Sequence, residues 1–125
     1  MTENPLGYPA EVWRLFRETP RAGRLESGSG VLSAEAGTAA GRLRLRLDCR
    51  IERGRVADSR FLAHGCPYTI AVGAWLAGWC LRRQQIELAA LPITELRAML
   101  EIPEDRAHCG LMAQDVLRAI AAQLT

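Results

Sequence analysis

The feature that most constrains the fold is a strict alternation of polar and apolar side chains over residues 42–51. Successive side chains of an extended strand point to opposite faces, so the apolar members share one face. These are Leu43, Leu45, Leu47, Cys49 and Ile51. The tripeptide Glu52-Arg53-Gly54 predicts a turn into a second strand at 55–64. We therefore expect an antiparallel hairpin with one apolar face that must be covered.

The other patterns predict a third strand near 31–36, after a Gly/Ser-rich link at 27–30. Apolar residues at helical spacing predict helices near 9–19, 67–83, 93–100 and 110–123. A chain of 125 residues is long enough for one domain and too short for two. We therefore predict a single domain, 1–125, of the α+β class, in which a three-stranded antiparallel sheet packs against helices.

Cys66 lies where the second strand gives way to a helix, in the segment Ala63-His64-Gly65-Cys66-Pro67. Proline suits the first helical position, where its missing N–H would have no partner. A thiol at a helix start lies near the positive end of the helix dipole, which favours the thiolate that attacks sulfur and binds metals. The sequence therefore predicts a reactive thiol, with a small buried apolar role as the alternative.

His108 and Cys109 form a second candidate site. Residues 103–106 interrupt a helical run, and a new run opens at Gly110, so we expect the pair at a non-helical helix start. Neighbouring side chains there can converge on one ion, which they cannot do on a regular helix face. A His-Cys dipeptide alone is a weak signal, and an ordinary structural role remains the alternative. Its similarity in context to Cys66 favours a shared metal or sulfur site.

The remaining cysteines are expected in the core. Cys49 shares the apolar strand face, and it lies roughly 25–30 Å from Cys66 at about 3.3 Å per residue. Cys80 follows Cys66 by about 20 Å of helix at about 1.5 Å per residue, among apolar neighbours. Neither is predicted to share a metal with Cys66.

Three separated segments resemble the iron–sulfur cluster assembly scaffolds of the IscU/NifU N-terminal type. The amino end has Tyr8, Val12 and Phe16 followed by Pro20-Arg21-x-Gly23. The centre has Asp58-Ser59-Arg60-Phe61, then Gly65-Cys66 and Ile70-Ala71. The carboxyl end has His108-Cys109-x-x-x-Ala113-x-Asp115. The order of these segments is that of the family, and the spacing from Cys66 to His108-Cys109 is close to it.

The resemblance implies a scaffold rather than an enzyme. In such proteins a cysteine desulfurase passes sulfur to a scaffold cysteine, and iron and sulfide build a [2Fe–2S] cluster that is handed to apo-proteins. The matching ligands here are Cys66, His108 and Cys109, with Cys109 as sulfur acceptor. The implied partners are a cysteine desulfurase, an iron donor and apo-protein acceptors, in the cytoplasm.

The chain departs from the family before its first long strand, where a first cluster cysteine and an aspartate are absent. If the apolar strand face keeps its register, Ala39 and Gly41 stand in their places, whereas a count without gaps selects Ala40 and Arg42. His64 stands where the family has Phe or Tyr. It is either a substitute metal ligand, on the side of Cys66 if the strand stays extended, or a plain aromatic replacement.

A second departure concerns the chaperone motif. The family shows Leu-Pro-Pro-Val-Lys before Ile-His-Cys, whereas this chain has Ile102-Pro103-Glu104-Asp105-Arg106-Ala107. The spacing is kept but two acids replace Pro and Val, which argues against recognition by a DnaK-type chaperone.

Composition narrows the compartment and the partners. No apolar run is long enough for a membrane span, and the amino terminus lacks the charged-then-apolar pattern of a secretion signal. In a protein that is not secreted, four cysteines indicate free thiols or metal ligands before disulfides. All sixteen basic residues are arginine, for a net charge of +2. A row of arginines at 42–50 suggests nucleic acid, but Asp48 and Asp58 interrupt it and no aromatic residue alternates with it. We expect a solvated face or a docking surface for an acidic protein, and no nucleic acid.

Three functions remain open from the sequence. The first is the cluster scaffold. The second is a zinc-dependent sulfur acceptor, although that branch of the family has an insertion between its second and third cysteines that this spacing lacks. The third is a non-catalytic module that binds a desulfurase, which the two missing ligands favour. A three-ligand site needs His64, water, a small thiol or a partner's residue to complete four-coordinate zinc or a cluster.

Overall fold

Three antiparallel strands form the sheet that the alternating pattern predicts. The computed structural model describes residues 4, 6–38 and 40–123. The strands lie in the order β1-β2-β3. The elements are α1 (Ala10–Glu18), β1 (Val31–Gly37), β2 (Arg44–Glu52), β3 (Arg55–His64), α2 (Pro67–Trp79), η1 (Gln85–Ala90), α3 (Ile93–Met99), η2 (Glu104–Arg106) and α4 (Ala107–Ala121). The predicted α+β class and strand count are confirmed.

The register of the sheet places the predicted apolar face inward. Arg44 pairs with His64 at one end of β2 and β3, and a tight turn follows Glu52 at the other. Leu45, Leu47 and Cys49 have no exposed surface. Their burial confirms the inward face read from the sequence.

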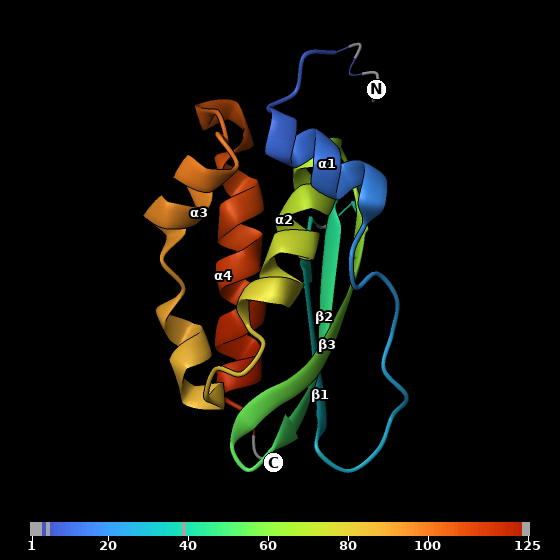
Figure 1. The fold of residues 1–125 in the computed structure, drawn as a ribbon, viewed down its shortest axis with the longest axis vertical. Coiled ribbons are helices and arrows are strands. Elements are labelled where there is room, and N and C mark those ends of the chain that lie inside the picture. The colour runs from blue at the N-terminus through green and yellow to red at the C-terminus, as the bar shows by residue number, and fades with distance from the viewer. Residues whose placement is uncertain (1–3, 5, 39, 124–125) are drawn as a thin grey trace.

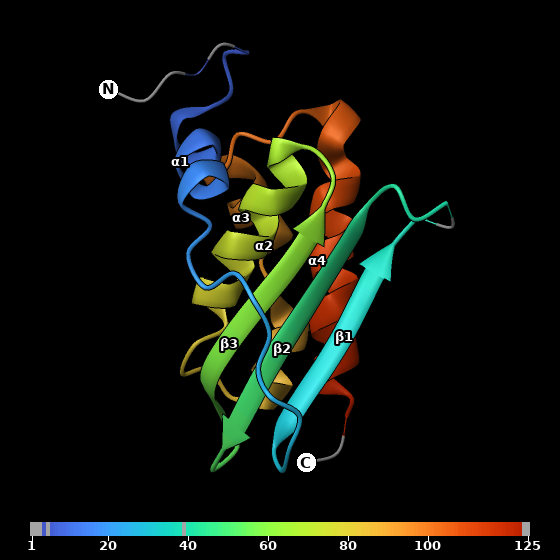
Figure 2. The same cartoon turned by 90° about the vertical axis from the view of Figure 1, so that its right-hand side faces the viewer.

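The helices all cover one face of this sheet. Helix α2 packs on β3 and β2, α4 packs on β1 and β2, and α1 lies against α2. Figure 1 shows the sheet nearly edge-on with the helices on one side, and Figure 2 shows its outer face with the helices behind. No helix in the described part of the chain is long and apolar enough to cross a membrane.

A close approach fixes α2 against the sheet. A Cβ atom at Gly73 would lie 2.5 Å from Cδ2 of Phe61 and 3.0 Å from Cδ1 of Leu45. Phe61 is also held on the edge of β3 that faces away from β2. Its N–H donates to the Arg21 carbonyl, and its carbonyl accepts from the Gly23 N–H. The helix that begins beside Cys66 is therefore positioned by a side chain that only glycine leaves room for.

The outer face is more covered than the sequence suggests. The segment before β1 crosses it (Figure 2), where the N–H of Leu25 donates to the carboxylate of Asp48 at 3.0 Å. Asp48 is 1% exposed and also accepts from Ser33 and Arg46. The expected solvated arginine row is therefore partly an internal network, because a distant segment folds over it.

Two helix boundaries differ from the predicted ones. Helix α2 ends at Trp79 and not near residue 83. Helix α4 begins at Ala107, so His108 and Cys109 lie in its first turn and not at a non-helical start before Gly110. The reason is that the short 3₁₀ helix η2, which begins after Pro103, continues directly into α4. The backbone is therefore already helical at His108 and Cys109.

Candidate cysteine site

Cys66 is the last residue before α2, as its sequence context predicts. It has extended backbone angles, φ −80° and ψ 171°, and Pro67 is the first helical residue. Gly65 has φ +152°, and a Cβ there would lie 2.7 Å from the Thr69 hydroxyl and 2.6 Å from Cδ2 of Leu43. Glycine is therefore required both for the turn and for the approach of Thr69 to this junction.

One hydroxyl connects Cys66 with Cys109. The Thr69 Oγ1 lies 3.6 Å from the Cys66 Sγ and 3.6 Å from the Cys109 Sγ. Thr69 and Cys109 have no exposed surface, whereas Cys66 is half-buried. Two of the three cysteine and histidine positions expected to act together thus meet through the first turn of α2.

The two thiols differ in their acidity. Burial opposes ionisation of Cys66, yet the pKa of its thiol is lowered because the N–H groups of Thr69 and Tyr68 and the Thr69 hydroxyl hydrogen-bond to the sulfur, and Arg106 is nearby. Burial raises the pKa of the Cys109 thiol, although the Thr69 hydroxyl partly opposes it. Cys66 is therefore the more readily ionised member of the pair, in the direction expected of a helix start.

His108 carries an unsatisfied nitrogen. Its Nε2 is buried and has no hydrogen-bond partner among the described residues. Buried polar atoms are nearly always paired, so an orphaned imidazole nitrogen is a candidate for a ligand role. Among residues 4, 6–38 and 40–123, no group of three or more His, Cys, Asp or Glu side chains is gathered closely enough to hold a metal ion.

His64 is placed apart from Cys66. It is exposed at the end of β3, opposite Arg44, and lines a hollow on the outer face with Arg24, Glu35 and Arg46. The Cys66 sulfur instead lies against Thr69. The condition for a shared side, a strand that stays extended through Cys66, is not met, because the strand ends at His64 and Gly65 turns the chain.

The loop between β1 and β2 lies at the same end of the sheet as Cys66. Gly37 pairs with Arg44, which in turn pairs with His64. The Leu43 side chain reaches Gly65, the neighbour of Cys66. Of the residues expected in place of the two absent ligands, Ala40, Gly41 and Arg42 are exposed in this loop, and Ala39 lies outside the described residues.

The other two cysteines form a pair that the sequence did not predict. Both are fully buried, which confirms the expected core role, and their sulfur atoms lie 4.0 Å apart. The estimated distances from Cys66, roughly 25–30 Å for Cys49 and about 20 Å for Cys80, are compatible with such a pair only if α2 runs back along β3.

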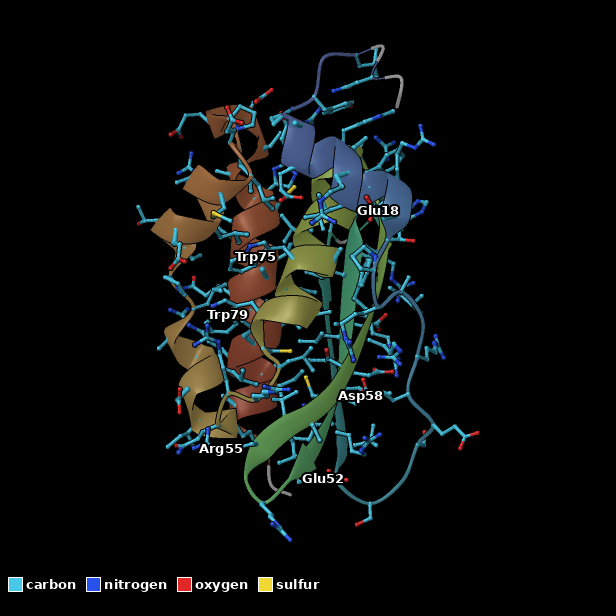
Figure 3. The ribbon with its side chains drawn as sticks, in the orientation of Figure 1. Glu18, Glu52, Arg55, Asp58, Trp75 and Trp79 are labelled. Atoms are coloured by element: carbon cyan, nitrogen blue, oxygen red, sulfur yellow. The ribbon has the colours of Figure 1, made fainter. Side chains whose placement is uncertain are left out.

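Two tryptophans of α2 line a hollow between α1 and α2. Trp75 and Trp79 are only half-buried, and their rings stack with centroids 6.1 Å apart. Figure 3 shows them one below the other along α2. Leu15 and Arg21 also line this hollow.

The structure is a small α+β domain in which the thiol at the strand-to-helix junction meets a second thiol from the first turn of α4. Residues 7–124 match the family described as NifU-like N terminal domain, and the chain belongs to that family.

Curated relatives carry a consistent description. The protein "Iron-sulfur cluster assembly scaffold protein IscU" of Haemophilus influenzae is 26% identical over 122 residues, which cover 94% of each chain. Its namesake in Azotobacter vinelandii is 28% identical over 119 residues, 91% of each chain. The Escherichia coli K12 protein of the same name is 28% identical over 95 residues, 76% of this chain and 72% of the relative.

Solved structures support the fold. The "Putative iron-sulfur cluster assembly scaffold protein for SUF system" of Fervidobacterium islandicum superposes with a TM-score of 0.70 at 13% identity, covering 90% of this chain and 96% of that one. A NifU-like N-terminal protein from Brucella abortus gives a TM-score of 0.57 at 19% identity, covering 90% of this chain and 79% of that one.

Proposed function

We propose that this protein is an iron–sulfur cluster assembly scaffold whose cluster is cargo rather than a resident cofactor. The observation that carries the proposal is the Cys66–Thr69–Cys109 arrangement, in a chain whose relatives are scaffolds by name. Thiolates are the usual protein ligands of iron–sulfur clusters, and Cys66 before α2 and Cys109 in α4 are the two candidates.

The candidate ligands are Cys66, Cys109 and His108. The residues fit a sulfur-rich site because two thiols face one hydroxyl and the His108 Nε2 is buried without a partner among the described residues. A fourth ligand has to come from water, a small thiol or a residue of a partner. His64 is the weakest choice, since it would have to leave the outer face of the sheet.

Cys66 is the better placed sulfur acceptor, whereas the family resemblance implies Cys109. Cys66 is half-buried and Cys109 is fully buried, so only Cys66 can meet a desulfurase without prior opening of the site. In the transfer, the Cys66 thiolate attacks the outer sulfur of a persulfide on the desulfurase. The desulfurase thiolate leaves, and Cys66 carries the persulfide.

The surface near this site also bears on partners. Glu104, which replaces an apolar residue of the chaperone motif, is exposed and pairs with Arg97 at 2.9 Å. An ion pair at that position supports the expectation that a DnaK-type chaperone does not recognise this chain. A cysteine desulfurase, an iron donor and apo-protein acceptors remain the proposed partners.

The test is the metal and sulfide content of the full chain purified without oxygen. Iron with labile sulfide in equal amounts is the expected result. Zinc without sulfide would replace the scaffold by a zinc-dependent sulfur acceptor. Neither metal nor sulfide, even after reconstitution with iron, a desulfurase and cysteine, would leave only a desulfurase-binding module.

A further inference from the structure

Helix α2 carries a cysteine at each end. Cys66 precedes its first residue, and Cys80 follows its last. The Cys80 sulfur lies 4.0 Å from the sulfur of Cys49 on the central strand β2. Both of these thiols are free and fully buried, and the proposed scaffold chemistry uses neither.

Hydrogen bonds orient the two thiols unequally. The Cys80 S–H donates to the carbonyl of Ala77 at 3.3 Å, and the Ser59 hydroxyl donates to the same carbonyl. Hydrogen bonding to Cys80 raises the pKa of the Cys49 thiol, and the same contact lowers that of Cys80. When Cys80 is ionised, the Cys49 S–H is the neighbouring donor to its sulfur.

We propose that Cys49 and Cys80 are an internal oxidation site, at which a hydroperoxide closes a disulfide between β2 and the end of α2. The Cys80 thiolate attacks the distal peroxide oxygen, the O–O bond breaks, and an alcohol or water leaves after protonation. Cys80 is then a sulfenic acid. The Cys49 sulfur attacks it, the S–S bond forms, and the hydroxyl leaves as water with the Cys49 proton. Two thiols are oxidised and one hydroperoxide is reduced.

The position of Cys80 makes closure feasible. A disulfide needs sulfurs about 2.05 Å apart, so the sulfurs must approach by about 2 Å. Cys80 lies just past the end of α2, and its N–H still bonds the Leu76 carbonyl. Closure requires that rotation of the Cys80 side chain brings the sulfurs together while this hydrogen bond holds the main chain. A small oxidant is required because neither thiol is exposed.

The proposed disulfide would stabilise the fold at a place distant from the proposed cluster site. The disulfide would join the far end of α2 to the sheet, whereas Cys66 and Cys109 meet at its beginning. The chain between the two cysteines spans 31 positions, so closing it removes much freedom from the unfolded chain. We expect the melting temperature to rise by roughly 10 °C.

The test uses a Cys66→Ala/Cys109→Ala background, in which Cys49 and Cys80 are the only thiols. After treatment with hydrogen peroxide and alkylation in denaturant, we expect monomers that take up no alkylating label and weigh about 2 Da less than the reduced protein. Trypsin should then release residues 47–50 linked to residues 61–82. A reductant should restore both labels and the original melting temperature.

A triple variant that adds Cys49→Ala is the matched control and should form no monomeric disulfide. The natural chain, mapped with trypsin and then chymotrypsin so that Cys66 is cut away from Cys80, should show the same link and guards against misfolding of the background. Two alkylated thiols after oxidation of folded protein would overturn the proposal. So would disulfide-linked dimers alone, or sulfinic acid at either cysteine without the link.

Discussion

Replacement of Gly73 by alanine tests the packing that positions α2 and hence Cys66. The new methyl group would meet Phe61 at 2.5 Å, well inside van der Waals contact. Overpacking of a core costs about 1–3 kcal/mol. Against this, alanine is more favourable than glycine in a helix interior by about 1 kcal/mol. We therefore expect Gly73→Ala to lower the free energy of unfolding by up to about 2 kcal/mol.

Gly78→Ala is the matched control in the same helix. A Cβ at Gly78 has no neighbour within 4 Å. This variant should gain about 0.4–1 kcal/mol. Urea unfolding of the two variants should differ by about 1–3 kcal/mol, and their melting temperatures by roughly 3–10 °C. Equal stability of the two variants would refute the account of how α2 sits on β3.

Three further changes probe the site and the outer face. Thr69→Val keeps the shape but removes the hydroxyl between the two sulfurs, so the pKa of Cys66 should rise and its alkylation near neutral pH should slow. His64→Phe should leave metal affinity unchanged, because His64 lies on the outer face; a tenfold loss, about 1.4 kcal/mol, would show that it is a ligand. Burial raises the pKa of Asp58, but the Ser59 N–H, Arg60 and Arg21 together lower it. Its contribution to stability is thus present above its unfolded pKa of about 4 and is lost as pH falls through the folded pKa. Asp58→Asn should flatten the acid limb of the stability profile, and an unchanged limb would contradict this.

The sheet was predictable because its signal is local. An alternation of period two fixes which side chains of 42–51 face inward, and Leu45, Leu47 and Cys49 are buried accordingly. The same rule assigned Asp48 to solvent, where it would be if nothing crossed the outer face. Its burial depends on Leu25, which is 23 positions away, and local periodicity carries no information about such a contact.

The candidate site was predictable in part. Pro67 and Gly65 mark the helix start at Cys66 directly, because each has a defined backbone role. Pro103 marks only where a helix cannot continue, so the start of α4 was placed too late and Cys109 was put outside it. The contact of Cys49 with Cys80 depends on the path of α2 across the sheet, which tertiary packing decides.

The most direct test of the central claim is cluster content in four single Cys→Ala variants, reconstituted without oxygen and corrected for the folded fraction. Alanine is chosen because a buried hydroxyl would add its own cost. The account predicts that loss of Cys66 or Cys109 removes most of the iron, sulfide and visible absorbance, whereas loss of Cys49 or Cys80 leaves them unchanged. Full retention of the cluster by both Cys66→Ala and Cys109→Ala would contradict the assignment of the site.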